Sequence, residues 1–467
     1  MKINPPDPIV DEKEPFKEAL FGRQKFGESL TALLRNVEDN LVVFIDAPWG
    51  EGKTTFARMW LAHLRDQKLE AIYFDAYAAD YHDDPFVSFS GEIVSFAKEN
   101  LEPKKALLAT DEFKKKAVEV GKKMAGLAFK VGIRAATMGI VAGKHLKEAK
   151  EIAAESLKGI GEIGSEIIEK SIANYAEEKD SLRKFKNSLK KLAAIFREEH
   201  GFPLTIVVDE LDRCRPDFAL ELLERIKHLF DVKGVAFVLL VNRNQIESYI
   251  RTIYGQTVDA HSYLLKFANV FLDLPKQLPP FPSEYAKTHE TYCDQLFEYH
   301  GLNDGTEERR HLNDAMVIFS LHFDLTLREI ERSFSTVVLF YVSLVPGGLA
   351  DEHLIPLLSV IKIKRPSLFK KLKTGTLSSQ DFLQETSLDK LKAGMHTRLH
   401  SEWIASLIDF CLMTDSELQT ALSTAKGTHP SLSTIYRYYS PRLIRLKRND
   451  LIPYFCSRLE QFDLKSK

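Results

Sequence analysis

The stretch from Ala47 to Thr55 combines two glycines with a lysine and two threonines, residue types that together can hold a polyphosphate. A glycine-rich loop that opens a helix points its backbone N–H groups inward at phosphate oxygens, and the helix dipole adds to the attraction. In such a loop Lys53 would reach the β- and γ-phosphates, and the Thr54 hydroxyl would bind Mg²⁺. The spacing therefore predicts a site for ATP and Mg²⁺, whose nucleotide-binding residues are Pro48, Trp49, Gly50, Glu51, Gly52, Lys53, Thr54 and Thr55.

The chain on either side of this loop has the pattern of the elements that must position it. The apolar run 41–45 predicts a buried strand, and the spacing of apolar residues over 56–64 predicts a helix. One departure is Ala47, where the usual G-x-x-x-x-G-K-[ST] pattern has its first glycine. Alanine fits that turn if its φ angle stays negative and is strained if it does not. The alternative, an ordinary glycine-rich turn before a helix, does not account for a lysine followed by two threonines.

An acidic motif further along the chain supplies the partner that a phosphate-binding loop requires. The apolar run 204–208 predicts a central parallel strand, and Asp209 and Glu210 follow it at the end where open α/β sheets bind ligands. Asp209 would hold Mg²⁺ through water, and Glu210 would orient or deprotonate the attacking water. The alternative is that both carboxylates cap the next helix.

Three more polar residues are candidates for the same site. Arg213 and Arg215 follow the acidic pair closely, so either could stabilise charge that develops during phosphoryl transfer, within the chain or across a subunit boundary. The structural alternative is a salt bridge to Asp212 or Glu221. Asn242 ends the next apolar run and is a candidate sensor of the γ-phosphate, with a turn residue as the alternative.

Several short strings resemble those of one protein family. They are Trp49-Gly50-Glu51-Gly52-Lys53-Thr54, Asp209-Glu210-Leu211-Asp212-Arg213-Cys214, Tyr263-Leu264-Leu265-Lys266-Phe267 and Val270-Phe271-Leu272-Asp273-Leu274-Pro275, with Phe21-Gly22-Arg23 upstream and Thr326-Leu327-Arg328-Glu329-Ile330-Glu331-Arg332 downstream. On these strings the chain resembles the KAP family of P-loop NTPases, over about 20–100 and 200–335. It departs from the family at Ala47 in the loop. It also departs at Ala76-Tyr77, since the family more often has a tryptophan after the second strand. Neither departure removes a group that handles phosphate or metal.

The resemblance implies ATP hydrolysis coupled to a conformational change. It also implies kinship with bacterial proteins of phage exclusion and with animal scaffolds linked to membranes. By the same analogy Arg328 acts as a second sensor of the bound nucleotide, and a surface arginine of a helix is the alternative.

The composition indicates a folded protein, and the net charge does not favour binding to nucleic acid or to a membrane. The 467 residues are 44% hydrophobic and 28% charged, which predicts a sizeable core. The formal net charge is −2, so no global field favours nucleic acid or a membrane. The four cysteines are scattered without a C-x-x-C pair and the N-terminus lacks an apolar signal core, which predicts a reducing cytoplasm, with membrane association as an alternative.

Residues 102–200 are predicted to form a helical insertion between the two nucleotide motifs. The segment 124–143 has ~20 residues, the length of a spanning helix, but Lys130 and Arg134 lie in its middle and would each cost about 2.5–3.5 kcal/mol at the bilayer centre. A transmembrane helix is therefore not expected. Residues 104–150 hold 12 Lys and Arg against 4 Asp and Glu. A solvated basic face, contact with an anionic membrane surface and contact with nucleic acid are all compatible with this excess.

The predicted fold class is α/β, with a P-loop NTPase core, a mostly parallel sheet, an inserted helical hairpin and an α-helical C-terminal region. The predicted domains are 1–101 with 201–282 for the core, 102–200 for the insertion, 283–345 for a helical lid and 346–467 for the C-terminal region. The predicted function is a KAP-type ATPase whose turnover of Mg-ATP drives a conformational or assembly switch, by resemblance in bacterial antiphage defence. Its partner would be a second copy of the chain or an effector encoded in the same operon. The alternatives are a nucleotide-gated scaffold with little turnover, a nucleic-acid-stimulated ATPase and a peripheral-membrane ATPase.

Overall fold

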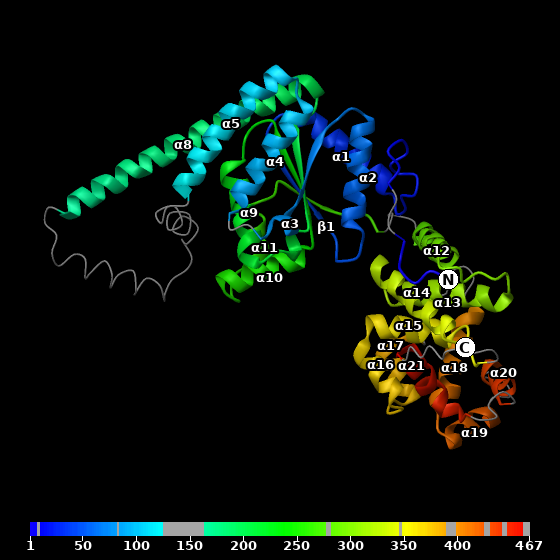
Figure 1. Cartoon of the computed structure of the whole chain (residues 1–467). Helices are drawn as coiled ribbons and strands as arrows, with labels where there is room; N and C mark the ends of the chain where they lie inside the picture. The colour runs from blue at the N-terminus through cyan, green and yellow to red at the C-terminus, as the bar shows by residue number, and fades with distance from the viewer. Residues whose placement is uncertain are drawn as a thin grey trace.

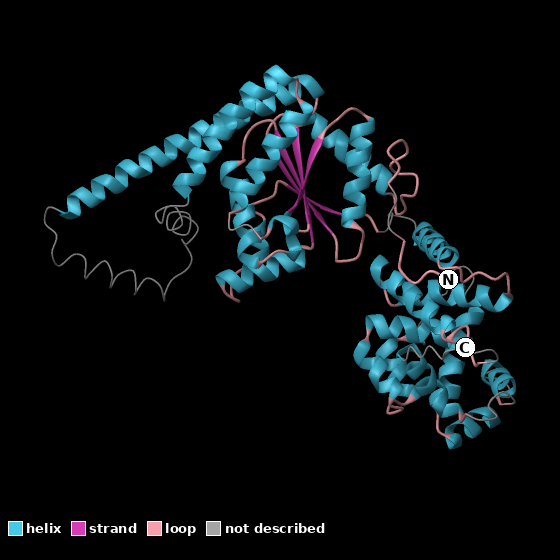
Figure 2. Ribbon diagram, viewed as in Figure 1, coloured by secondary structure: helices cyan, strands magenta, loops and turns pink. Residues whose placement is uncertain are grey.

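A computed structural model describes residues 1–6, 10–81, 84–124, 163–276, 282–344, 348–388, 398–424, 430–440 and 446–460. They form an α/β core and, beyond it, a region made of helices (Figure 1 and Figure 2). The five strands are Leu41–Asp46 (β1), Ala71–Asp75 (β2), Leu204–Asp209 (β3), Val235–Val241 (β4) and Val270–Asp273 (β5). All their pairings are parallel, so the predicted α/β class with a mostly parallel sheet is confirmed.

The order of the strands decides where the two nucleotide motifs meet. The order is β2-β3-β4-β1-β5, so β4 lies between β1, which leads into the phosphate-binding loop, and β3, which carries the acidic pair. The register pairs Asp46 of β1 with Val241 of β4, and Asp75 of β2 with Asp209 of β3. The carboxyl ends of the strands therefore lie along one edge, which is where open α/β sheets bind ligands.

The central strands β1, β3 and β4 are buried on both faces, since almost all their residues are buried and successive side chains of a strand point to opposite faces. On one face Val43 and Ile45 of β1 pack in a cluster that includes Trp60. On the other face Phe44 belongs to a second cluster that includes Phe89. Burial on both faces explains why these three strands are almost continuously apolar in the sequence.

Helices connect and cover the strands. They are Arg23–Asn36 (α1), Lys53–Asp66 (α2), Ala76–Ala79 (α3), Pro85–Asn100 (α4), Pro216–Leu229 (α9), Arg243–Tyr254 (α10) and Ala260–Leu264 (α11), with a 3₁₀ turn at Leu211–Arg213 (η2). Side chains of α1 and α2 belong to the first cluster, and those of α4 and α9 belong to the second. Local signals set where some of them begin, since Asp84 caps the amide of Phe86 at the start of α4 and Pro216 is the first residue of α9.

Helices Pro103–Met124 (α5) and Ile163–His200 (α8) form the inserted hairpin, which extends away from the sheet (Figure 1). The ring of Phe185 in α8 lies 5.3 Å from that of Phe113 in α5 and 5.6 Å from that of Phe230, centroid to centroid. Aromatic contacts thus join the two helices to each other and to the core. The segment 124–143 lies, except for its first residue, outside the described residues. No helix of the described part of the chain has both the length and the apolar character that crossing a bilayer requires.

The described residues after β5 contain helices and no strand. The helices are Pro282–Tyr299 (α12), Glu307–His322 (α13), Leu327–Val342 (α14), Leu354–Lys364 (α15), Pro366–Lys373 (α16), Ser379–Thr386 (α17), Arg398–Leu412 (α18), Asp415–Thr424 (α19), Pro430–Tyr439 (α20) and Leu451–Glu460 (α21), with a 3₁₀ turn at Arg448–Asp450 (η4). This confirms the predicted helical C-terminal region. One apolar cluster contains Phe319 and Phe340 from the predicted lid and Phe455 from the region after it, so the boundary between the two stays a prediction.

Candidate functional site

The phosphate-binding loop runs from the end of β1 to the first residue of α2. Gly50 and Gly52 have φ angles of 88° and 74°, which residues with a Cβ rarely adopt. Ala47 is not among the non-glycine residues with a positive φ, and its amide donates a 3.1 Å hydrogen bond to the carbonyl of Val241. The alanine at the usual glycine position is therefore accommodated without the strain of a left-handed backbone.

The ammonium group of Lys53 lies inside the loop, and the lysine side chain is only 8% exposed. It donates hydrogen bonds to the carbonyl oxygens of Ala47 at 2.8 Å and Pro48 at 3.4 Å. Its nitrogen also lies 3.3 Å from Oδ2 of Asp212. Because an ammonium has three N–H donors, these three acceptors can engage all of them. Oxygen atoms of the protein thus hold Lys53, the residue predicted to bind phosphate, within the loop.

The acidic pair lies at the end of β3 and reaches the start of α2. The Thr54 hydroxyl donates to Oε1 of Glu210 at 3.1 Å, which joins two motifs 156 residues apart. Asp209 is buried and accepts hydrogen bonds from the Tyr73 hydroxyl at 3.1 Å and from the amide of Glu210 at 2.8 Å. Burial raises the pKa of both carboxyls above their ordinary values, and the charge of Asp209 raises the pKa of Glu210 further. Glu210 has a φ of 61°, a sparsely populated conformation of the kind found at functional sites.

The two arginines after the acidic pair have carboxylate partners in this structure. Arg213 forms an ion pair with Glu210 through its Nε atom. Arg215 lies 3.0 Å from Asp80 through Nε, and its backbone amide donates to the same carboxylate at 2.9 Å. Arg213 therefore contacts the carboxylate predicted to orient water. Whether either arginine also contacts a phosphate stays a prediction.

Asp212 is a central residue of the site to which the sequence analysis gave no role beyond a possible salt bridge. It lies in η2 and is 1% exposed. Its Oδ2 atom accepts hydrogen bonds from the indole N–H of Trp49 at 2.7 Å and from the backbone amide of Asn242 at 2.9 Å, and it is also the atom nearest Lys53. The signal was present in the sequence, because Asp212 stands three residues after Asp209 in the string D-E-L-D-R-C. One carboxylate thus joins two residues of the predicted loop to Asn242, which was predicted separately.

Arg23 holds the loop from outside the acidic motif, and the sequence analysis gave it no role in the site. Its guanidinium donates to the carbonyl of Glu51 through Nη2 and to that of Gly52 at 3.3 Å through Nη1. It is 5% exposed, and burial lowers its pKa to about 10 while Glu51 and Tyr292 act in the opposite direction. A Cβ at Gly52 would lie 2.7 Å from Nη1, and the residue that carries it would have to adopt a φ of 74°, so this clamp of Arg23 on the two carbonyls favours a glycine there. The upstream string Phe21-Gly22-Arg23 was its signal.

The loop also touches the helical region. The amide of Arg328, in the first turn of α14, donates a 3.0 Å hydrogen bond to the carbonyl of Gly50. The buried Glu51 carboxylate pairs with Lys276 at 2.9 Å, and Lys276 pairs at the same distance with Asp324. The structure thus brings the predicted sensor Arg328 next to the phosphate-binding loop. Lys276, which the sequence analysis did not single out, links the loop to the helical region.

The oxygen donors near the loop suit a magnesium ion held jointly with a nucleotide. Mg²⁺ takes oxygen ligands and commonly binds through one or two protein side chains plus phosphates and water. The Thr54 hydroxyl lies beside Glu210, with Asp209 adjacent in the chain and Thr55 following in α2. Among the described residues no group of three or more His, Cys, Asp or Glu could hold a metal. The donor set therefore fits an ion shared with phosphates and not an all-protein cage.

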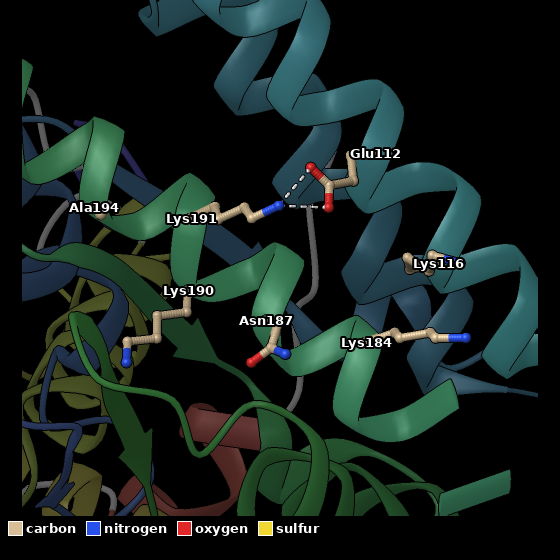
Figure 3. A pocket seen from close by; sticks show the side chains of 7 residues that line it. All are labelled: Glu112, Lys116, Lys184, Asn187, Lys190, Lys191 and Ala194. Carbon is tan, nitrogen blue, oxygen red and sulfur yellow. Dashed lines mark hydrogen bonds and ion pairs between the residues drawn. The ribbon is translucent and has the colours of Figure 1, made fainter. Parts of the chain in front are cut away.

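A separate hollow of about 600 Å³ lies on the inserted hairpin (Figure 3). It is lined by Glu112, Lys116, Lys184, Asn187, Lys190, Lys191 and Ala194. Three of its four lysines are paired with carboxylates: Lys191 with Glu112 and Lys116 with Glu119, both at 2.9 Å, and Lys184 with Asp180 at 2.7 Å. Most of its positive charge is therefore offset. The membrane or nucleic-acid contact predicted through 104–150 stays a prediction, since 125–150 lie outside the described residues.

A strand–loop–helix phosphate cradle and an acidic pair, both at the carboxyl edge of one parallel sheet, define a P-loop NTPase. The family model described as the KAP family P-loop domain matches residues 23–344, more than two thirds of the chain. The chain therefore belongs to the KAP family, among the nucleotide-binding NTPases.

Two further comparisons add little to this assignment. A comparison with curated proteins finds no match. Among solved structures, the chain is similar to the Aeropyrum pernix ORC2 protein, solved as ADPNP-ADP complexes, with 13% identity over 94% of this chain and 93% of that chain and a TM-score of 0.33. The fold assignment rests on the parallel sheet and on the family match.

Proposed function

We propose that this chain binds ATP with Mg²⁺ and hydrolyses it at the β–γ phosphoanhydride. The observation that carries the proposal is the hydrogen bond from Thr54 to Glu210, because it puts the start of the loop helix next to the acidic pair. The buried position of Lys53 inside the loop supports the same reading. The segment after β1 and the end of β3 thus supply a cation, a hydroxyl and two carboxylates, which are the groups that phosphoryl transfer to water uses.

Each residue has a role that follows from its chemistry. Gly50 and Gly52 let the backbone amides approach the phosphates, and Lys53 exchanges its protein acceptors for β- and γ-phosphate oxygens. Thr54 and Asp209 would hold Mg²⁺, which when bound neutralises charge on the phosphates. Glu210 accepts the proton of the water whose oxygen attacks the γ-phosphorus, and the bond from that phosphorus to the bridging oxygen breaks, which leaves ADP and inorganic phosphate.

The contacts between the loop and the helical region support a switch as the output. Arg328 lies against Gly50, and Lys276 connects Glu51 with Asp324. A change in loop geometry on binding or hydrolysis would shift these contacts and so bias the arrangement of the helices. We propose that the switch changes assembly, with a second copy of the chain or with an operon-encoded effector.

Phosphate release by the purified full chain tests the enzymatic part. Glu210→Gln keeps the size of the side chain but cannot take a proton, so we expect turnover to fall by at least about 100-fold. Glu92→Gln, on the exposed side of α4, is the matched control and should leave turnover unchanged. Wild-type release no faster than that of Glu210→Gln would end the enzyme claim.

A nucleotide-gated scaffold with little turnover is the second candidate, and a specific observation favours it. Glu210 is paired with Arg213, whose charge lowers the pKa of Glu210 against the larger effect of burial and so makes it a weaker base than the same buried carboxylate without the arginine. The scaffold predicts tight binding of ATP by calorimetry together with phosphate release indistinguishable between wild type and Glu210→Gln.

An antiphage role is proposed from the family resemblance alone. In a bacterial host that expresses the intact operon, we expect the efficiency of phage plating to rise when Lys53→Ala replaces the wild type, because the substitution removes the phosphate ligand. Equal plating of wild type and variant across a phage panel would contradict the role.

A further inference from the structure

Asp212 has more contacts than a simple buried ion pair. Its Oδ2 atom accepts from Trp49 at 2.7 Å and from the amide of Asn242 at 2.9 Å, and faces Lys53 at 3.3 Å. Its Oδ1 atom has no hydrogen-bond partner among the described residues. Two neutral donors and one cation thus share a single oxygen of a carboxylate that is 1% exposed.

The cation is the one of these three donors that a nucleotide would take away. Lys53 must reach phosphate oxygens that carry more charge than Asp212, and its other two acceptors are loop carbonyls. When Lys53 leaves, Asp212 keeps the indole N–H and the Asn242 amide, so the buried carboxylate is still hydrogen-bonded. The exchange therefore costs Asp212 its cation but leaves two hydrogen bonds to its Oδ2 atom.

We propose that Asp212 is a positioning residue that latches Lys53 and Trp49 across the empty phosphate-binding loop, and that nucleotide binding requires Lys53 to leave it. The proposal rests on the proposed nucleotide binding and adds its regulation. Because Asp212 pairs with Lys53 when no nucleotide is bound, this latch stabilises the nucleotide-free protein. For the same reason it weakens the affinity for nucleotide. A purely structural role would make loss of Asp212 harmful to both stability and affinity, so the two roles differ in sign.

Calorimetry with Mg-ATP and thermal melting of the full chain separate these roles. For Asp212→Asn we expect the melting temperature of the nucleotide-free protein to fall by several degrees, because a buried lysine loses its partner. We expect the affinity for Mg-ATP to rise about tenfold. Asp80→Asn is the control, since it removes a carboxylate that Arg215 holds, and its affinity should stay within about twofold of wild type. Unchanged or weaker binding by folded Asp212→Asn would overturn the latch.

Trp49→Phe gives a second test that does not depend on the folding of Asp212→Asn. The substitution removes one neutral donor from Oδ2 of Asp212, so that separating Lys53 from this carboxylate costs more free energy. The affinity for nucleotide should therefore fall severalfold. Unchanged or tighter binding by Trp49→Phe would also overturn the latch. If Asp212→Asn binds Mg-ATP and the wild type does not, the latch is supported. If neither protein binds Mg-ATP, both the latch and the proposed function fail.

Discussion

The backbone amide of Arg328 donates a 3.0 Å hydrogen bond to the carbonyl oxygen of Gly50, so the first turn of α14 rests on the phosphate-binding loop. The two residues are 278 positions apart in the chain, and the contact joins the α/β core to the helical region. The capping box of Thr326 and Glu329 fixes the start of that helix, with reciprocal hydrogen bonds of 3.3 and 2.7 Å. The loop and the helical region are thus in direct backbone contact at the point where phosphates would bind.

Gly50→Ala should therefore damage both the loop and its contact with α14. Gly50 has a φ of 88°, and an added Cβ would lie 2.7 Å from the Cβ of Arg328. We expect affinity for Mg-ATP to fall at least about tenfold, because the loop must move or the helix must retreat. Gly305→Ala is the matched control, since its φ is 80° and nothing lies within 4 Å. It should cost about 1 kcal/mol of unfolding free energy and leave nucleotide affinity unchanged, and equal binding by both variants would refute the contact's importance.

Arg23→Ala should destabilise the phosphate-binding loop. The substitution removes two hydrogen bonds to the carbonyls of Glu51 and Gly52, so we expect the free energy of unfolding to fall by about 3 kcal/mol and nucleotide affinity to fall with it. Arg23→Lys keeps the charge but not the forked donors and should be intermediate. Arg35→Ala, an exposed position of the same helix, is the control for urea denaturation and calorimetry. A stability of Arg23→Ala equal to that of Arg35→Ala would contradict the clamp.

Arg213→Ala should change the pH dependence of phosphate release. The Arg213 charge lowers the pKa of Glu210, against the larger effect of burial that raises it. Without that charge Glu210 stays protonated to higher pH, so the acid limb of the pH–rate profile should move up by at most about one pH unit. Arg215→Ala, whose partner is Asp80, should leave that limb in place. The same shift in both variants, or in neither, would rule out a specific effect of Arg213 on Glu210.

Acid should destabilise the helical region through His289. This residue is fully buried, lies 2.8 Å from the Ser320 hydroxyl, and has its pKa lowered to about 4, mainly by burial and further by Lys276. An unfolded histidine titrates at about 6.5, so the unfolded chain binds the proton first as the pH falls, and stability is lost between about pH 6.5 and pH 4. Between pH 7.5 and pH 5 this group should remove about 2 kcal/mol of unfolding free energy.

Urea denaturation of wild type and His289→Gln at both pH values measures that contribution. The variant cannot titrate at this position, so its loss of stability on acidification should be smaller. Some pH dependence should remain, because the pKa values of His228 and His300 are also lowered by burial. An identical loss in both proteins would mean that His289 does not carry the effect.

The parallel sheet and the phosphate-binding loop were predictable because local patterns carry them. Continuous apolar runs mark buried parallel strands, and the glycine–lysine–threonine string marks a loop that opens a helix. The strand order was not predictable in this way. Nothing near Leu41 or Leu204 indicates that β4 lies between their strands, because pairing depends on contacts between segments far apart in the chain.

By itself the sequence determined which chemical groups this protein has for phosphate and metal, and that they follow strands and open helices. Only the tertiary structure decided which of them meet. The motif strings mark Asp212 and Arg23 as parts of motifs, but nothing in the local sequence of these two residues or of Lys276 says what they contact. The reason is physical: a buried carboxylate or guanidinium takes its partners from whatever donors and acceptors the packed chain places within about 3 Å of it. Trp49, Lys53 and the amide of Asn242 converge on one oxygen of Asp212 because strand order and loop geometry place them there.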